Sequence, residues 1–154
     1  MTCEGFKEEY PYTDCIAYEK NHKTISAQEK GKKFIINNIS KKVFIKVRID
    51  NCIFRTSNNR KCDYLFINCN DDILYLVELK GAHLEHAIKQ LLQTIDEFKD
   101  KKFYNNSAVV NAYVIMSKAR TPALNLTDEI KLRKKLKSKN GIFSRKVGSL
   151  KIEV

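Results

Sequence analysis

The amino-acid sequence predicts an α/β fold in which helices flank a mixed central β-sheet. Three stretches of the chain lead to this prediction. Two apolar runs, Tyr64–Cys69 and Ile73–Leu79, are separated by a short polar turn and are typical of a β-hairpin. Apolar residues spaced three and four apart over Leu84–Phe98 indicate an amphipathic helix, and the nearly continuous apolar run Ala108–Met116 indicates a strand buried on both faces. A strand pair, a helix and a buried strand in this order favour helices packed on a mixed sheet.

The chain before the hairpin carries fewer signals. Residues 1–23 have poor periodicity and predict no element. The tetrapeptide Ser26-Ala27-Gln28-Glu29 has the form of a capping box, so we expect a helix from there to about Asn38. Apolar and polar residues alternate over Val43–Ile49, which predicts a half-buried strand.

The chain after the buried strand is basic. Residues 99–107 are charged and rich in asparagine, and we expect a loop there. Thr127 is placed to cap a short basic helix that Gly141 ends. Ile142–Phe143 and Ser149–Val154 are expected to form short terminal strands.

Length and composition indicate one globular domain over residues 1–154, with a core at about 26–118 and a basic extension at 119–154. The hydrophobic content of 43% and the charged content of 31% are globular values and exclude a disordered chain. We expect neither a membrane span nor a signal peptide, because no apolar run is long enough. The five cysteines are odd in number and form no C-x-x-C, so we expect reduced thiols in the cytoplasm rather than disulfides or a zinc ribbon.

The hairpin carries the candidate active site. If its turn is centred on Asn70-Asp71, Asp63 lies opposite Glu78, and Lys80 shares their face of the sheet. Two carboxylates so close repel each other unless a cation lies between them. Mg²⁺ suits such a site, since it binds one or two carboxylates and keeps several waters. The alternative is a cross-strand ion-pair cluster of Lys80 with one of the two acids.

These residues resemble the signature of the PD-(D/E)XK nuclease superfamily, which includes restriction endonucleases and Holliday junction resolvases. Asp63 is followed on the next strand by Glu78-Leu79-Lys80, and Ala87 and Gln90 resemble the glutamine motif of the following helix. The resemblance covers roughly residues 43–117. Cys62 stands where the signature has proline, a variation that the superfamily tolerates.

The resemblance implies a restriction-endonuclease-like core and a set of site residues. Asp63, Glu78 and the backbone carbonyl of Leu79 would hold Mg²⁺, for which Mn²⁺ can substitute. Lys80 would be catalytic and Gln90 would support the site. Nucleases of this superfamily often carry a further acid on the first helix, for which Glu29 and Glu19 are the candidates. Asp50 is another possible accessory acid.

The net charge of +11 suggests a polyanionic partner. Residues 118–154 hold eleven basic side chains against three acids, and so carry +8 of this charge. The candidates for phosphate contacts are basic residues near the site and in the C-terminal part: Arg55, Arg60, Lys61, Arg120, Lys131, Arg133, Lys134 and Lys135. The alternative for each is an ordinary solvated charge.

The sequence therefore predicts a metal-dependent nuclease, with DNA the favoured substrate. No helix-turn-helix or zinc finger is present in the sequence, so specificity would come from loops, from a homodimer or from a partner protein. Two alternatives remain open. The first is a non-catalytic module that binds nucleic acid or protein on a nuclease-like fold, and the second is a ribonuclease that acts as an effector.

Overall fold

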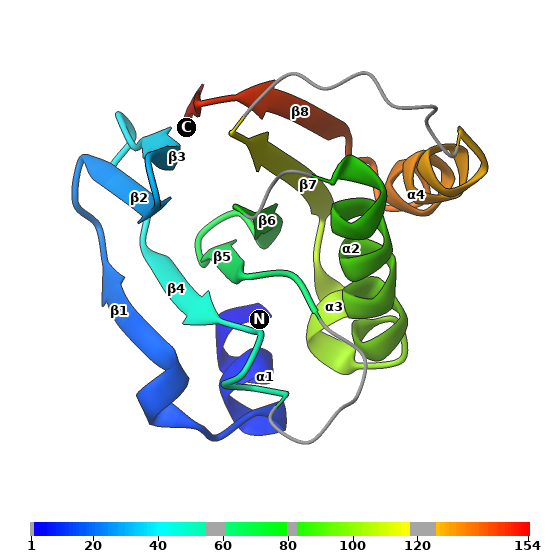
Figure 1. Cartoon of the computed structure of the whole chain (residues 1–154). Coiled ribbons are helices and arrows are strands. Elements are labelled where there is room, and N and C mark those ends of the chain that lie inside the picture. Colours follow the sequence, from blue (N-terminus) through cyan, green and yellow to red (C-terminus); the bar gives the residue numbers. More distant parts are fainter. Residues whose placement is uncertain (1, 55–60, 80–82, 118–125) are drawn as a thin grey trace.

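The computed structural model describes residues 2–54, 61–79, 83–117 and 126–154, and these form a mixed α/β fold in three layers (Figure 1). The middle layer is a six-stranded sheet of order β1-β4-β5-β6-β7-β8. Its strands are β1 (Ile16–Lys20), β4 (Phe44–Arg48), β5 (Tyr64–Asn68), β6 (Ile73–Glu78), β7 (Val109–Met116) and β8 (Phe143–Val147). Pairing is antiparallel from β1 to β6 and parallel from β6 to β8, so the predicted mixed sheet is confirmed.

The two outer layers each enclose a hydrophobic core against this sheet. Helices lie on one face: α1 (Thr2–Glu9), α2 (Leu84–Phe98), α3 (Lys102–Asn106) and α4 (Leu126–Lys137). A three-stranded sheet lies on the other face, made of β2 (Thr24–Glu29), β3 (Lys32–Asn37) and β9 (Ser149–Glu153). A 3-10 turn, η1 (Thr13–Cys15), leads into β1. The bounds of α2 are those that its apolar stripe predicted.

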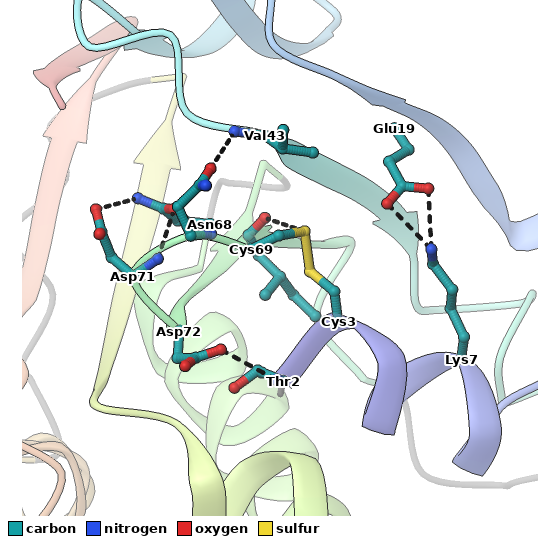
Figure 2. The surroundings of a disulfide bond; sticks show 11 residues. Thr2, Cys3, Lys7, Glu19, Val43, Asn68, Cys69, Asp71 and Asp72 are labelled. Atoms are coloured by element: carbon teal, nitrogen blue, oxygen red, sulfur yellow. Dashed lines mark hydrogen bonds and ion pairs between the residues drawn. A yellow bond between two sulfur atoms is a disulfide. The ribbon is translucent and has the colours of Figure 1, made fainter.

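The hairpin of β5 and β6 has the register that its turn predicted. Tyr64 pairs with Val77 and Asn68 pairs with Ile73, so the turn is centred between Asn70 and Asp71. The side chain of Asn68 holds this turn together: its Oδ1 accepts hydrogen bonds from the backbone N–H groups of Asn70 and Asp71, at 3.1 Å each (Figure 2). This cap stabilises the register that places the candidate site.

The helix expected from Ser26 to about Asn38 is wrong, because this segment forms the hairpin of β2 and β3. Lys30 and Gly31 have φ angles of 47° and 79°, the left-handed conformation of a two-residue hairpin turn. Apolar side chains alternate with polar ones on both strands and face the second core: Ile25, Ala27, Phe34 and Ile36. This alternation of period two decides the structure, whereas the tetrapeptide that resembles a capping box has no helical stripe behind it.

Two further segments differ from expectation. Residues 1–23 contain α1 and β1, and the expected loop at 99–107 contains the short helix α3. Helices α1 and α3 pack on each other through aromatic rings, with the Phe6 ring in an edge contact to Phe103 at 5.1 Å between centroids. Neither segment is long enough for its periodicity to be read from the sequence.

The C-terminal part is built into both sheets, so it is not an extension. Strand β8 pairs with β7, and β9 pairs with β3. Leu132 and Leu136 of α4 are fully buried in the first core. Gly141 passes so close to β7 that a Cβ atom there would overlap the carbonyl oxygen of Val110. The core therefore continues well beyond residue 118, the boundary that the charge distribution suggested.

The expectation of reduced thiols is wrong for four of the five cysteines. Cys3 is joined to Cys69 (Figure 2), Cys15 is joined to Cys52, and Cys62 is a buried free thiol. Structural disulfides are typical of oxidising compartments, so the cysteines no longer support the cytoplasmic localisation. No helix in the described part of the chain has the length and apolar character to cross a membrane.

Candidate active site

Asp63 and Glu78 lie across from each other where the hairpin opens. Asp63 directly precedes β5 and Glu78 ends β6, so the register that pairs Tyr64 with Val77 places the two acids opposite one another. Their exposed fractions are 7% and 0%. Asp63 Oδ2 accepts a hydrogen bond of 2.8 Å from the backbone N–H of Leu79, which fixes this carboxylate against β6.

Helix α2 and Asp50 hold the backbone that leads into Asp63. The N–H of Cys62 donates to Thr94 Oγ1 at 2.9 Å, and this hydroxyl donates to the carbonyl of Gln90 at 2.8 Å. Gln90 Nε2 donates to the carbonyl of Lys61 at 3.4 Å, and the N–H of Lys61 donates to Asp50 Oδ1 at 3.1 Å. Gln90, which was expected to support the site, thus contacts the backbone of the segment that precedes Asp63.

Thr94 is a residue that the sequence reasoning missed. It is fully buried on the same helix as Gln90, four residues further along. A polar residue inside an apolar stripe was the available signal, because a buried hydroxyl needs hydrogen-bond partners.

Replacing Thr94 by valine is expected to destabilise the chain by about 1–3 kcal/mol, since the isosteric change leaves the buried N–H of Cys62 without its acceptor. Thr94→Ser keeps the hydroxyl and is expected to retain most of that stability. Urea unfolding of the three proteins measures both effects. A valine variant as stable as the wild type would show that this hydrogen bond does not hold the segment.

A small acidic hollow lies beside Asp63. Its volume is about 30 Å³, which is enough space for a water molecule. The residues that line it come from β2, β4 and β5 and from the segments that follow β4 and precede β5: Glu29, Arg48, Asp50, Asn51, Asp63 and Tyr64. Glu29 thus reaches the site from β2 rather than from a first helix. Glu19, the other candidate, instead pairs with Lys7 at 2.9 Å on the surface.

Burial and the two opposed acids raise the pKa of the Cys62 thiol. Burial raises the pKa of Cys62, the Thr94 hydroxyl lowers it, and the charges of Glu78 and Asp63 raise it further. The thiol is therefore protonated at neutral pH. A neighbourhood that disfavours a third negative charge is one that favours a cation.

The predicted phosphate-binding residues separate into three groups. Lys61 is only 2% exposed, with Nζ 4.0 Å from Glu97 Oε1, so it belongs to the interior and not to a binding surface. On α4, Lys131 and Lys134 are exposed, whereas Arg133 and Lys135 pair with acids. The others, Arg55, Arg60 and Arg120, lie outside the described residues, as does the predicted catalytic Lys80.

The candidate metal ligands of the site are carboxylate oxygens, which are hard donors. Mg²⁺ prefers carboxylate and carbonyl oxygens and keeps several waters, so a pair of carboxylates such as Asp63 and Glu78 fits it chemically. A group of three possible ligands, within 4.8 Å of one another, occurs in the described part of the chain at Asp14, Cys15 and Cys52. Its two sulfur atoms are joined in a disulfide, so they are not metal ligands in this state.

The site therefore combines opposed buried acids, an adjacent acidic hollow and a helix that fixes the connecting backbone. Such an arrangement can bind a divalent cation and present it to an anionic substrate. Comparisons of this chain with known protein families, with curated proteins and with solved structures found no match. The geometry of the site is thus the basis for assigning a function.

Proposed function

We propose that this chain is a metal-dependent nuclease of the PD-(D/E)XK type with a restriction-endonuclease-like core. The observation that carries the proposal is the opposition of Asp63 and Glu78 at the open end of the hairpin. Both side chains are buried, and two like charges there favour a bound divalent cation. The order of hairpin, helix with Gln90 and parallel strand agrees with the resemblance in the sequence.

Each predicted site residue would have its own role in metal binding or catalysis. Asp63, Glu78 and the carbonyl of Leu79 would hold Mg²⁺, and the bound ion would supply Lewis-acid stabilisation of charge on the phosphate. Lys80 would donate hydrogen bonds to the phosphate oxygens or orient the attacking water. Gln90 keeps Asp63 in place through the backbone that precedes it.

Asp50 and Glu29 would complete the acidic side of the site. Both line the hollow next to Asp63, where one water molecule has room. A carboxylate there accepts a hydrogen bond from water and orients it. Arg48, on the same hollow, offers a guanidinium to a phosphate.

The test compares the wild type with Lys80→Ala on end-labelled duplex DNA, single-stranded DNA and RNA of one sequence. Each substrate is incubated with Mg²⁺, with Mn²⁺ and with EDTA. We expect cleavage of DNA that needs both the divalent ion and Lys80. Lys33→Ala is the matched control, because Lys33 is an exposed lysine on β3 and is expected to leave cleavage unchanged.

Intact substrate in every lane, with a mobility shift that persists in EDTA, would overturn the nuclease proposal. It would favour the alternative of a binding module on the same fold. Cleavage confined to RNA would keep the active site but replace the substrate, as a ribonuclease effector requires.

A further inference from the structure

We propose that a row of cations and tyrosine rings beside the acidic hollow binds one strand of nucleic acid and leads it to the active site. The row, here called the cation track, consists of Lys20, Tyr18, Lys46, Tyr64 and Arg48. None of these residues belongs to the phosphate contacts predicted from sequence. The inference rests on the proposed function and names the substrate class of the same site.

The cation track is continuous across β1, β4 and β5. Tyr18 is the cross-strand partner of Lys46, and Arg48 is the partner of Tyr64. Lys20 Nζ lies 4.0 Å from the centre of the Tyr18 ring. Lys46 Nζ lies between the two rings, 5.7 Å from that of Tyr18 and 5.0 Å from that of Tyr64.

The track ends at the candidate active site. Tyr64 follows Asp63 directly in the chain, and Arg48, Tyr64 and Asp63 line the same hollow. Burial raises the pKa of Tyr64, the charge of Arg48 lowers it, and the charges of Glu29 and Asp63 raise it. A phosphate chain lying on the track would therefore reach the acids that are proposed to hold the metal.

The cations of the track form no ion pair within the described residues, although Arg48 shares the acidic hollow with Glu29 and Asp63. Within the described residues, no carboxylate lies within 4.0 Å of the charged nitrogens of Lys20, Lys46 or Arg48. Burial, followed by the charge of Lys20, lowers the pKa of Lys46. The repulsion between Lys20 and Lys46 is relieved when an anion binds across them.

A single strand suits this surface better than a duplex. Proteins that bind single strands combine a basic path for the phosphates with aromatic rings on which bases stack. Tyr18 and Tyr64 are half-buried, so part of each ring is accessible, and the Tyr18 hydroxyl accepts a hydrogen bond of 3.4 Å from the N–H of Ser26. This hydrogen bond holds the Tyr18 ring against β2, next to Lys20 and Lys46.

The test measures binding of a fluorescein-labelled single-stranded DNA by anisotropy in EDTA, over a series of salt concentrations. Lys20→Ala/Lys46→Ala is compared with Lys33→Ala/Lys151→Ala, a control that removes the same charge from exposed positions on β3 and β9. We expect the track variant to bind about tenfold or more weakly and its salt slope to fall by about 1.4, the value for two lost phosphate contacts of a single strand. The control is expected to bind within about twofold of the wild type. Melting temperatures establish that each variant is folded.

Three results would overturn the inference: equal losses in both variants, no loss in the track variant, or a wild type that does not bind the strand. The same DNA as a duplex forms a second arm of the experiment. An equal or larger loss of duplex binding in the track variant would overturn the assignment to a single strand.

Cleavage of the same DNA by the wild type with Mg²⁺ is measured in parallel. If the wild type cleaves DNA and the track variant binds as well as the wild type, the nuclease proposal is supported and the cation track is overturned. If the track variant loses binding and the wild type cleaves no substrate, the cation track is supported and the nuclease proposal is overturned.

Discussion

Replacement of Glu78 by glutamine is expected to reduce metal-dependent cleavage by about a hundredfold or more while the fold is retained. Glu78 is fully buried opposite Asp63, so an amide of the same shape keeps the packing but removes one of the two negative charges. The remaining carboxylate binds a divalent cation more weakly, because a hard cation prefers charged oxygen ligands.

Metal binding is measured directly by the melting temperature. A ligand at a hundred times its Kd stabilises the folded state by about 2.7 kcal/mol, which for a chain of this length is a rise of roughly 5–10 °C. We expect Mg²⁺ to raise the melting temperature of the wild type by this amount and that of Glu78→Gln hardly at all. In EDTA the variant should be as stable as the wild type or more so, since like-charge repulsion is relieved.

Glu153→Gln is the matched control, because Glu153 is exposed at the end of β9. It should respond to Mg²⁺ as the wild type does. An equal Mg²⁺ response in Glu78→Gln and in the wild type would show that the opposed acids are not the metal site. This change in melting temperature is measured without any nucleic-acid substrate.

Reduction of the two disulfides is expected to lower the free energy of unfolding by several kcal/mol. Cys3 and Cys69 are 66 positions apart, and Cys15 and Cys52 are 37 positions apart. In the chain-entropy treatment, a bond that closes a loop of such length stabilises the folded state by about 4 kcal/mol. The first bond ties α1 to the turn of the central hairpin (Figure 2), and the second lies two residues beyond Asp50.

Urea unfolding with and without dithiothreitol measures this contribution. The wild type should unfold at a lower urea concentration when reduced. A variant in which alanine replaces Cys3, Cys15, Cys52 and Cys69 should resemble the reduced wild type and not respond to the reductant. Identical curves for oxidised and reduced wild type would contradict the prediction.

The features predicted correctly from sequence are those in which local pattern and burial agree. The hairpin of β5 and β6 has apolar runs on both sides of a turn rich in Asn and Asp, and helix α2 has a broad apolar stripe from Leu84 to Phe98. A hydrophobic pattern of fixed period also fixes the register, because a slip of one residue would turn every side chain to the wrong face. That is why the opposition of Asp63 and Glu78 was predictable.

The features that were missed depend on contacts between distant segments. Cysteine pairing is set by tertiary proximity, and nothing in the spacing of Cys3 and Cys69 indicates a bond between them. Glu29 was a candidate for the site because of an expected helix, yet it reaches the hollow from β2. Lys61 follows basic residues in the sequence, but the fold buries it beneath α2. Position in the chain alone does not specify any of these placements.

The pairing of β3 with β9 bears on the order in which the acidic hollow can form. Strands β2 and β3 are joined by a two-residue turn, whereas Lys33 of β3 pairs with Ser149 of β9, far away in the sequence. Closing a short turn costs little entropy, and closing a long loop costs more. The hairpin of β2 and β3 can therefore form before β9 docks. Glu29 belongs to that hairpin, so its wall of the acidic hollow is supported by the complete small sheet only after this long-range pairing, which is a slow step of folding.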